Sequence, residues 1–180
     1  MLITTSRNPT HYLRRMSKII ALSIPNSQRL TRGSLNLDKI FRYCRNQQIN
    51  RLLILQKDSV KGSILVKAYS IETKPQLIKA MIKLTEIISL QKHDKTRRIM
   101  IEKVHLNFTD NVNKEEKENI YEFFSPIIHN SGESRSTKLL TISFRKNRSN
   151  SLIGHAVQQN LSDSLHLYTI QITPECNNDE

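Results

Sequence analysis

The sequence predicts an α/β fold, with a mixed sheet of the α+β kind, built as two similar halves. Apolar residues at helical spacing alternate along the chain with short apolar runs of strand length. The strand patterns of the first half return in the same order in the second half. With 180 residues, the chain is long enough for one domain or for two small subdomains sharing a core. We expect one domain over residues 1–173, with halves at about 1–84 and 85–173 and a flexible tail at 174–180.

The first quarter of the chain predicts two strands, each followed by a helix. Residues 1–5 form a short apolar strand, and apolar residues then recur at helical spacing from Thr10 to about Ser23. Residues 28–31 form a second strand, and a turn at Gly33 leads into a second helix. The inward face of that helix carries Leu37, Ile40, Phe41 and Cys44.

A strand hairpin is expected next, over residues 51–57 and 63–69, with a polar turn between them. Residues 77–84 fit either an amphipathic helix or a strand, and the repeat in the chain favours the strand. A basic loop at 92–98, a strand at 98–108 and a capped helix start with acidic residues at 109–118 follow.

The duplication rests on four similarities that keep the same order in both halves. Two of them share an offset of about 88 residues, which a chance likeness between strands does not explain. The similar segments are 40–43 and 120–123, 51–57 and 138–146, 63–69 and 151–157, and 82–84 and 170–172.

The positive charge is concentrated in the first third of the chain. The net charge is +12 and the isoelectric point about 9.9. Residues 1–60 hold 11 of the 28 basic residues and only 2 of the 16 acidic ones, so they contribute +9. A basic excess in one segment indicates a surface that faces a polyanion. The alternative is a generally basic proteome.

Catalytic and cofactor motifs are missing from the sequence. It has no glycine-rich phosphate loop, no metal-spaced histidine or cysteine pair and no Gly-x-Ser-x-Gly motif, and its histidines are scattered. Cys44 and Cys176 form no such pair. No apolar run of membrane-spanning length and no signal peptide is found. We therefore expect a cytoplasmic monomer that is not an enzyme, with no cofactor, no metal and no membrane contact.

The segment that links the first strand to the first helix is a candidate anion site. It aims backbone N–H groups and the positive end of the helix dipole at one point, where Ser6, Arg7 and Thr10 add donors. The alternative is that Ser6, Asn8 and Thr10 only cap the helix. Alternation in the second strand places Arg29 and Thr31 on one face.

Three segments of the first half resemble the Brix domain, most closely the small archaeal proteins that consist of this domain alone. They are MLITTSRNPTHYLRRMSK, IPNSQRLTRGSLNLDKI and NRLLILQK, within residues 1–57. The resemblance implies two α/β halves, each similar to the anticodon-binding domain of class IIa aminoacyl-tRNA synthetases. It also implies a role in ribosome biogenesis on precursor ribosomal RNA. The residues that match are Thr4, Thr5, Ser6, Arg7, Pro9, Arg29, Arg32 and Gly33.

Charge and resemblance together predict a non-catalytic RNA-binding factor that binds or chaperones precursor ribosomal RNA, with ribosome-assembly proteins as further partners. The alternatives are a protein-interaction adaptor whose basic face docks an acidic partner, and an unrecognised RNA-processing enzyme. The residues predicted to contact RNA are Ser6, Arg7, Arg14, Arg15, Arg29 and Arg32.

Overall fold

The structure is a computed structural model that describes residues 1–58, 63–71, 75–77, 80–87, 103–124, 139–147, 151–159 and 164–174. The first half contains β1 (Leu2–Thr5), α1 (His11–Ser23), β2 (Gln28–Arg29), α2 (Leu37–Asn46), β3 (Arg51–Lys57), β4 (Ser63–Ile71), β5 (Pro75–Leu77) and β6 (Ala80–Ile87). The second half contains β7 (Lys103–Phe108), α3 (Lys114–Phe124), β8 (Leu139–Lys146), β9 (Leu152–Gln159) and β10 (Ser164–Pro174).

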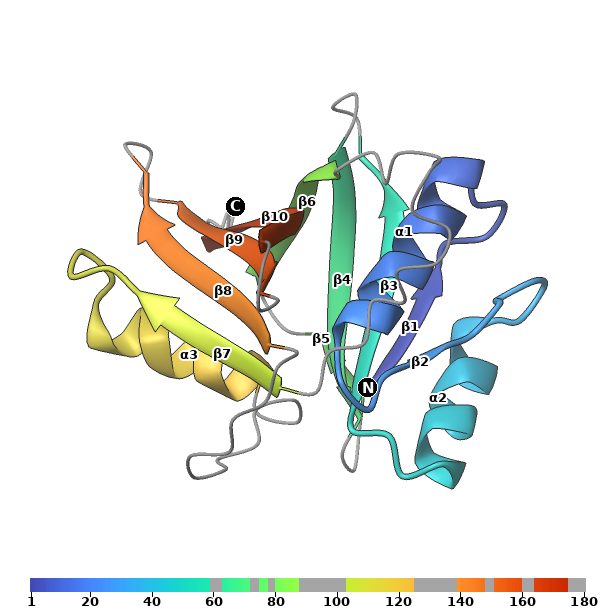
Figure 1. The fold of residues 1–180 in the computed structure, drawn as a ribbon. Helices are drawn as coiled ribbons and strands as arrows, with labels where there is room; N and C mark the ends of the chain where they lie inside the picture. The colour runs from blue at the N-terminus through green and yellow to red at the C-terminus, as the bar shows by residue number, and fades with distance from the viewer. Residues whose placement is uncertain are drawn as a thin grey trace, which may run out of the picture.

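The ten described strands belong to one mixed sheet, which confirms the predicted fold class. The order across the sheet is β2-β1-β3-β4-β6-β10-β9-β8-β7, and β5 pairs with β4 beside this path. In Figure 1 the first half lies on the right and the second half on the left. They join at the centre, where β6 and β10 pair antiparallel.

Each half repeats the same strand arrangement. β1 runs parallel to β3 as β7 does to β8, and the next two pairings in each half are antiparallel. The register agrees residue by residue, since Ile64 pairs with Leu84 and Leu152 pairs with Ile172. Both residues of the second pair lie 88 positions after those of the first. The duplication predicted from the sequence is therefore confirmed for these strands.

The helices cover the two faces of the sheet unequally. α1 and α3 contribute to one apolar cluster, which includes Met16 and Ile120, whereas α2 packs Ile40 and Cys44 into a second cluster on the other face. β1 is buried along its whole length because it lies between α1 and α2.

One predicted equivalence is wrong. The segments 40–43 and 120–123 look alike in sequence, but they belong to α2 and α3, which pack into different clusters. α3 is instead the counterpart of α1. It starts 103 residues after α1, and it follows β7 as α1 follows β1.

Several boundaries differ from those expected. β2 spans only Gln28–Arg29, because the chain leaves β1 after Leu30 donates its N–H to Ile3. The segment 77–84 is strand, as predicted, but β6 continues to Ile87, beyond the expected boundary between the halves. β10 extends to Pro174. Residues 98–102 of the expected strand at 98–108, the loop at 92–98 and the tail residues 175–180 lie outside the described residues.

Both first-half helices begin at polar caps. The Thr10 hydroxyl accepts the Leu13 N–H at 3.2 Å, and the Asn36 side chain accepts the Lys39 N–H at 2.9 Å. α1 then buries one apolar stripe against the sheet and ends at Ser23, with Ile24 as its C-cap ahead of Pro25.

Cys44 is fully buried in the cluster under α2. Burial raises the pKa of its thiol to about 11. Only the thiolate reacts with alkylating reagents. In a Cys176→Ser variant at pH 8, we expect native Cys44 to be labelled far more slowly than after unfolding in urea, as measured by intact mass. Equal labelling rates in the two states would contradict this burial.

Phe144 in β8 and Gly154 in β9 are direct cross-strand partners in the core. The Phe144 ring is fully buried, and a Cβ added at Gly154 would lie 2.6 Å from its Cε1 atom. The equivalent pair of the first half is Leu55 and Val66, both buried. The two halves therefore fill the equivalent part of the core in different ways. The second half places a phenylalanine opposite a glycine, and the first half places a leucine opposite a valine.

Candidate nucleic-acid interface

The two strand-to-helix connections have the same backbone geometry. The Ser6 N–H donates to the Leu55 carbonyl at 2.7 Å, and the Thr109 N–H donates to the Phe144 carbonyl at 3.0 Å. The donor is the first residue after β1 in one half and after β7 in the other. The acceptor lies two residues before the end of the parallel neighbour, β3 or β8. We call these connections the first junction (residues 6–10) and the second junction (residues 109–113).

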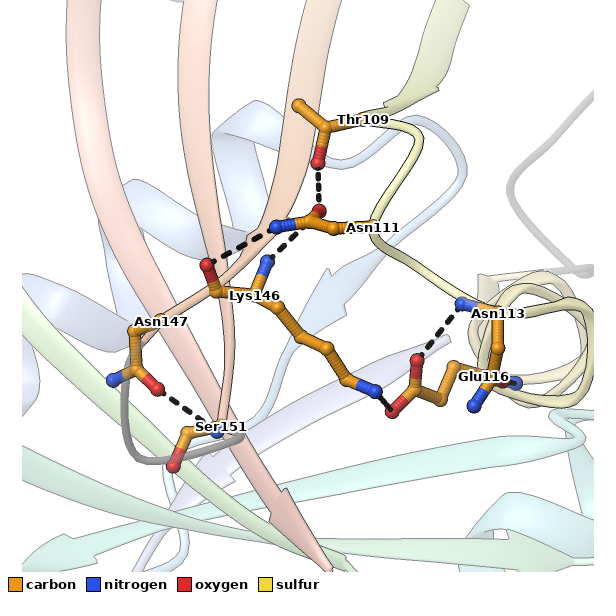
Figure 2. Close-up of polar contacts among 7 residues, drawn as sticks. All are labelled: Thr109, Asn111, Asn113, Glu116, Lys146, Asn147 and Ser151. Atoms are coloured by element: carbon orange, nitrogen blue, oxygen red, sulfur yellow. Dashed lines mark hydrogen bonds and ion pairs between the residues drawn. The ribbon is translucent and has the colours of Figure 1, made fainter.

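The second junction is closed by its own side chains (Figure 2). The Asn113 side chain accepts the Glu116 N–H at 2.8 Å, and the Glu116 carboxylate accepts the Asn113 N–H at 3.0 Å. The same carboxylate forms an ion pair with Lys146 at 2.9 Å, where both side chains are about one-fifth exposed. Asn111 bonds to the backbone of Lys146 from the other side. The Glu116 carboxylate and the Lys146 ammonium at this junction thus neutralise one another.

Removing the Glu116 carboxylate should destabilise the second half. We expect Glu116→Ala to lower the free energy of unfolding by about 1 kcal/mol, because it removes a reciprocal cap and a half-buried ion pair. The matched control is Glu118→Ala on the same helix, whose ion pair with Lys114 is exposed and joins atoms 3.8 Å apart. It should change stability by less than about 0.5 kcal/mol. Urea titration of both variants checks this, and equal losses would show that the cap contributes nothing.

Among the described residues, the first junction has no counterpart of the ion pair between Glu116 and Lys146. Leu13 occupies the helix position of Glu116, three residues after the cap, and Arg7 occupies the junction position of Asp110. The first turn of α1 contains no acidic residue. Lys57 ends β3 as Lys146 ends β8, and it is exposed. The Thr10 hydroxyl caps the helix, as the alternative interpretation of this segment expects. Ser6 is half-buried beside exposed Arg7.

Arg32 lies next to Arg7 at the end of β1. Its guanidinium donates to the Leu35 carbonyl at 3.1 Å and to the Thr5 carbonyl at 3.5 Å. Burial lowers the pKa of Arg32, and the guanidinium of Arg7 lowers this pKa further. The charges of Arg7 and Arg32 thus add to a positive field at this end of β1, which attracts anions.

Arg29 is held against α1 at the edge of the sheet. Its Nε donates to the Ser17 hydroxyl at 2.9 Å, and that hydroxyl donates to the Arg14 carbonyl at 2.9 Å. Arg29 pairs with Ile3 in register and therefore shares the α1 face of the sheet. Its guanidinium is fixed in orientation while the residue stays exposed.

The structure brings some of the six predicted residues together and separates others. Arg7, Arg32 and Ser6 lie at the end of β1, and Arg29 lies along the same edge. On α1, with 100° between successive residues, Arg14 lies on the flank of Ser17 and Arg15 on the opposite flank. We refer to Ser6, Arg7, Arg14, Arg29, Arg32 and Lys57 as the first-half cationic edge.

Lys57 is the residue of this edge that sequence reasoning missed. The repeat in the sequence could have identified it, because Lys57 takes the position of Lys146 when β3 is aligned with β8. Both halves thus have a lysine at this position, Lys57 or Lys146. Among the residues that the structure describes, only the second half has a carboxylate, Glu116, that pairs with it.

Two classes of site are missing from the described part of the chain. None of its residues form a group of three or more His, Cys, Asp or Glu side chains that would hold a metal ion. Within the same residues, no helix has the length and apolar character needed to cross a membrane.

The fold is similar to that of a probable ribosomal biogenesis protein from Aeropyrum pernix K1, known from its crystal structure. The superposition has a TM-score of 0.66 and covers 97% of this chain and 96% of that chain, with 15% sequence identity. No family model matches the chain. No curated protein matches it in sequence either. The structural likeness therefore shows a shared fold over almost the whole chain.

Proposed function

We propose that this protein is a non-catalytic RNA-binding factor of the Brix type that acts in ribosome biogenesis in the cytoplasm. In this role it binds precursor ribosomal RNA as a monomer and holds it while ribosome-assembly proteins dock. The first-half cationic edge makes the contact, mainly with phosphates.

The observation that carries the proposal is the contrast between the two junctions. They share a backbone geometry, yet the second is neutralised by Glu116 and the first presents Arg7 beside Arg32 with no acidic residue in the first helical turn. Two backbone carbonyls hold the Arg32 guanidinium at the end of β1, and Arg7 is exposed beside it. Phosphate groups supply the compensating charge.

Two further observations support a ribosomal role. The structural neighbour, which shares the fold over nearly its full length, is named as a probable ribosomal biogenesis protein. The segments that resemble the Brix domain include residues 1–18 and 24–40, from which most residues of the cationic edge come.

A filter-binding titration with a structured ribosomal RNA fragment at several salt concentrations tests the proposal. We expect the logarithm of affinity to fall linearly with the logarithm of salt concentration, with a slope of about −0.9 per phosphate contacted. No retention of RNA at 50 mM salt would reject the proposal and favour an adaptor for an acidic protein. Shortening of the RNA during incubation would reject the non-catalytic role.

A further inference from the structure

The second half leaves one face of its sheet without a helix among the described residues. α1 and α3 both pack on the opposite face, and α2 packs over β1 and β3. Along β7, β8 and β9, residues that alternate with the buried ones point towards this uncovered face. His105, Asn107 and Arg145 on it are exposed, and Ser143 and His155 are half-buried.

These residues form ordered rows across the strands. Asn107 pairs with Ser143, Ser143 with His155, and His155 with Thr169, so four polar side chains stand in one line across β7, β8, β9 and β10. The His155 ring lies 3.4 Å from the Thr169 hydroxyl, which shows that both project from the same face, where Thr169 is the buried member of the row. Arg145 lies in the next row, about 7 Å along the strand.

The strands concerned carry almost no negative charge. Across β4 and β6–β10 the only acidic residue is Glu86, against the five cations Lys67, Lys83, Lys103, Arg145 and Lys146. Lys146 is already paired with Glu116 on the opposite face. Exposed Arg145 thus gives the uncovered face a positive charge beside its hydrogen-bonding groups.

We propose that this face, centred on Asn107, Ser143, His155 and Arg145, is a second RNA-contacting surface, which we call the polar sheet face. It rests on the proposed function and extends the footprint of the bound RNA from the first half to the second. Its chemistry fits the sugar–phosphate backbone. Arginine takes the phosphates, and serine, asparagine and histidine side chains bond to phosphate and 2′-hydroxyl oxygens.

An acidic peptide is the other conceivable occupant, and the composition of the face argues against it. Protein–protein interfaces place apolar or aromatic anchors at their centre. The central row of the polar sheet face consists instead of Asn107, Ser143, His155 and Thr169, and its aliphatic residues Ile153 and Val157 lie half-buried in the rows on either side.

The test compares two charge reversals in the second half, measured with the same ribosomal RNA fragment. Arg145→Glu changes the polar sheet face, and Lys114→Glu makes the same change in charge on α3, on the other side of the sheet. For each protein, the affinity at 50 mM salt is divided by the affinity at 200 mM salt. We expect Arg145→Glu to lower this ratio by about threefold, which is the contribution of one phosphate contact. Lys114→Glu should leave that ratio unchanged. Asn107→Asp, which keeps the side-chain shape at an exposed position, should weaken binding in the same direction even if Arg145→Glu fails to fold.

The outcomes separate this inference from the proposed function. RNA binding by the wild type with equal affinities for Arg145→Glu and Lys114→Glu would overturn the polar sheet face and leave the proposed function standing. No binding by the wild type at 50 mM salt would overturn both. If Arg145→Glu keeps its RNA affinity and loses binding to poly-glutamate, the occupant is an acidic protein and the inference is wrong.

Discussion

Replacing Gly154 with valine is expected to lower the free energy of unfolding by about 3 kcal/mol, because it forces a side chain into a filled position of the core. Even the first side-chain atom at this position would lie 2.6 Å from Cε1 and 2.9 Å from Cδ1 of Phe144. The ring has little room to move, because it is fully buried and stacks on Phe108 with ring centroids 5.6 Å apart. Urea unfolding followed by circular dichroism measures the loss.

The duplication provides a rescue for this variant. The first half holds Leu55 and Val66 at the equivalent positions, so Phe144→Leu with Gly154→Val rebuilds a pair that the same fold already accommodates. We expect the double variant to recover most of the stability lost by Gly154→Val. The two single changes should therefore be strongly non-additive. Additive losses would show that the two halves do not use this pair in the same way.

Arg7→Glu is expected to weaken RNA binding more than any other single charge reversal in the first half. It removes one cation and places a carboxylate beside Arg32, whose pKa the guanidinium of Arg7 now lowers. The new ion pair would neutralise Arg32 as well, so the slope of log affinity against log salt should become shallower by about two contacts. The ratio of affinities at 50 and 200 mM salt should then fall by about tenfold.

Stability provides an internal control for this variant. Arg7 is exposed, and the change replaces its repulsion of Arg32 by an attraction. The free energy of unfolding should therefore equal or exceed that of the wild type. The matched control is Arg42→Glu, also exposed and located on α2. An equal loss of affinity in both variants would mean that RNA responds to the overall charge and not to the first-half cationic edge.

Much of the fold could be predicted from local patterns. The period of apolar residues identifies α1 and α2, and the shared offset of 88 relates β4 and β6 to β9 and β10. The offset did not reveal which strands pair, and the pairing of β4 with β6 and of β9 with β10 comes from the structure. The equivalence of residues 40–43 and 120–123 failed because an apolar helical face looks alike on either side of a sheet. Which side a helix covers depends on the connections that precede it, and α3 follows its strand directly, as α1 does.

The candidate site was less predictable, for reasons of geometry. A residue's position along a helix does not reveal which flank faces a neighbouring strand. Arg14 and Arg15 therefore look equivalent in sequence, and only the bond between Arg29 and Ser17 distinguishes their flanks. The short extent of β2 also depends on tertiary contacts, since the Thr4 hydroxyl holds the Leu30 carbonyl at 2.9 Å as the chain turns away.

The most direct test of the central claim is photo-crosslinking of the bound ribosomal RNA fragment, with the crosslinked residues identified by mass spectrometry. If the open first junction holds the phosphate backbone, crosslinks will include residues 6–10 and the neighbourhood of Arg32. The neutralised second junction, residues 109–113, will give none. Crosslinks that spare residues 1–58 entirely, in a complex that forms and shows salt dependence, would contradict the account.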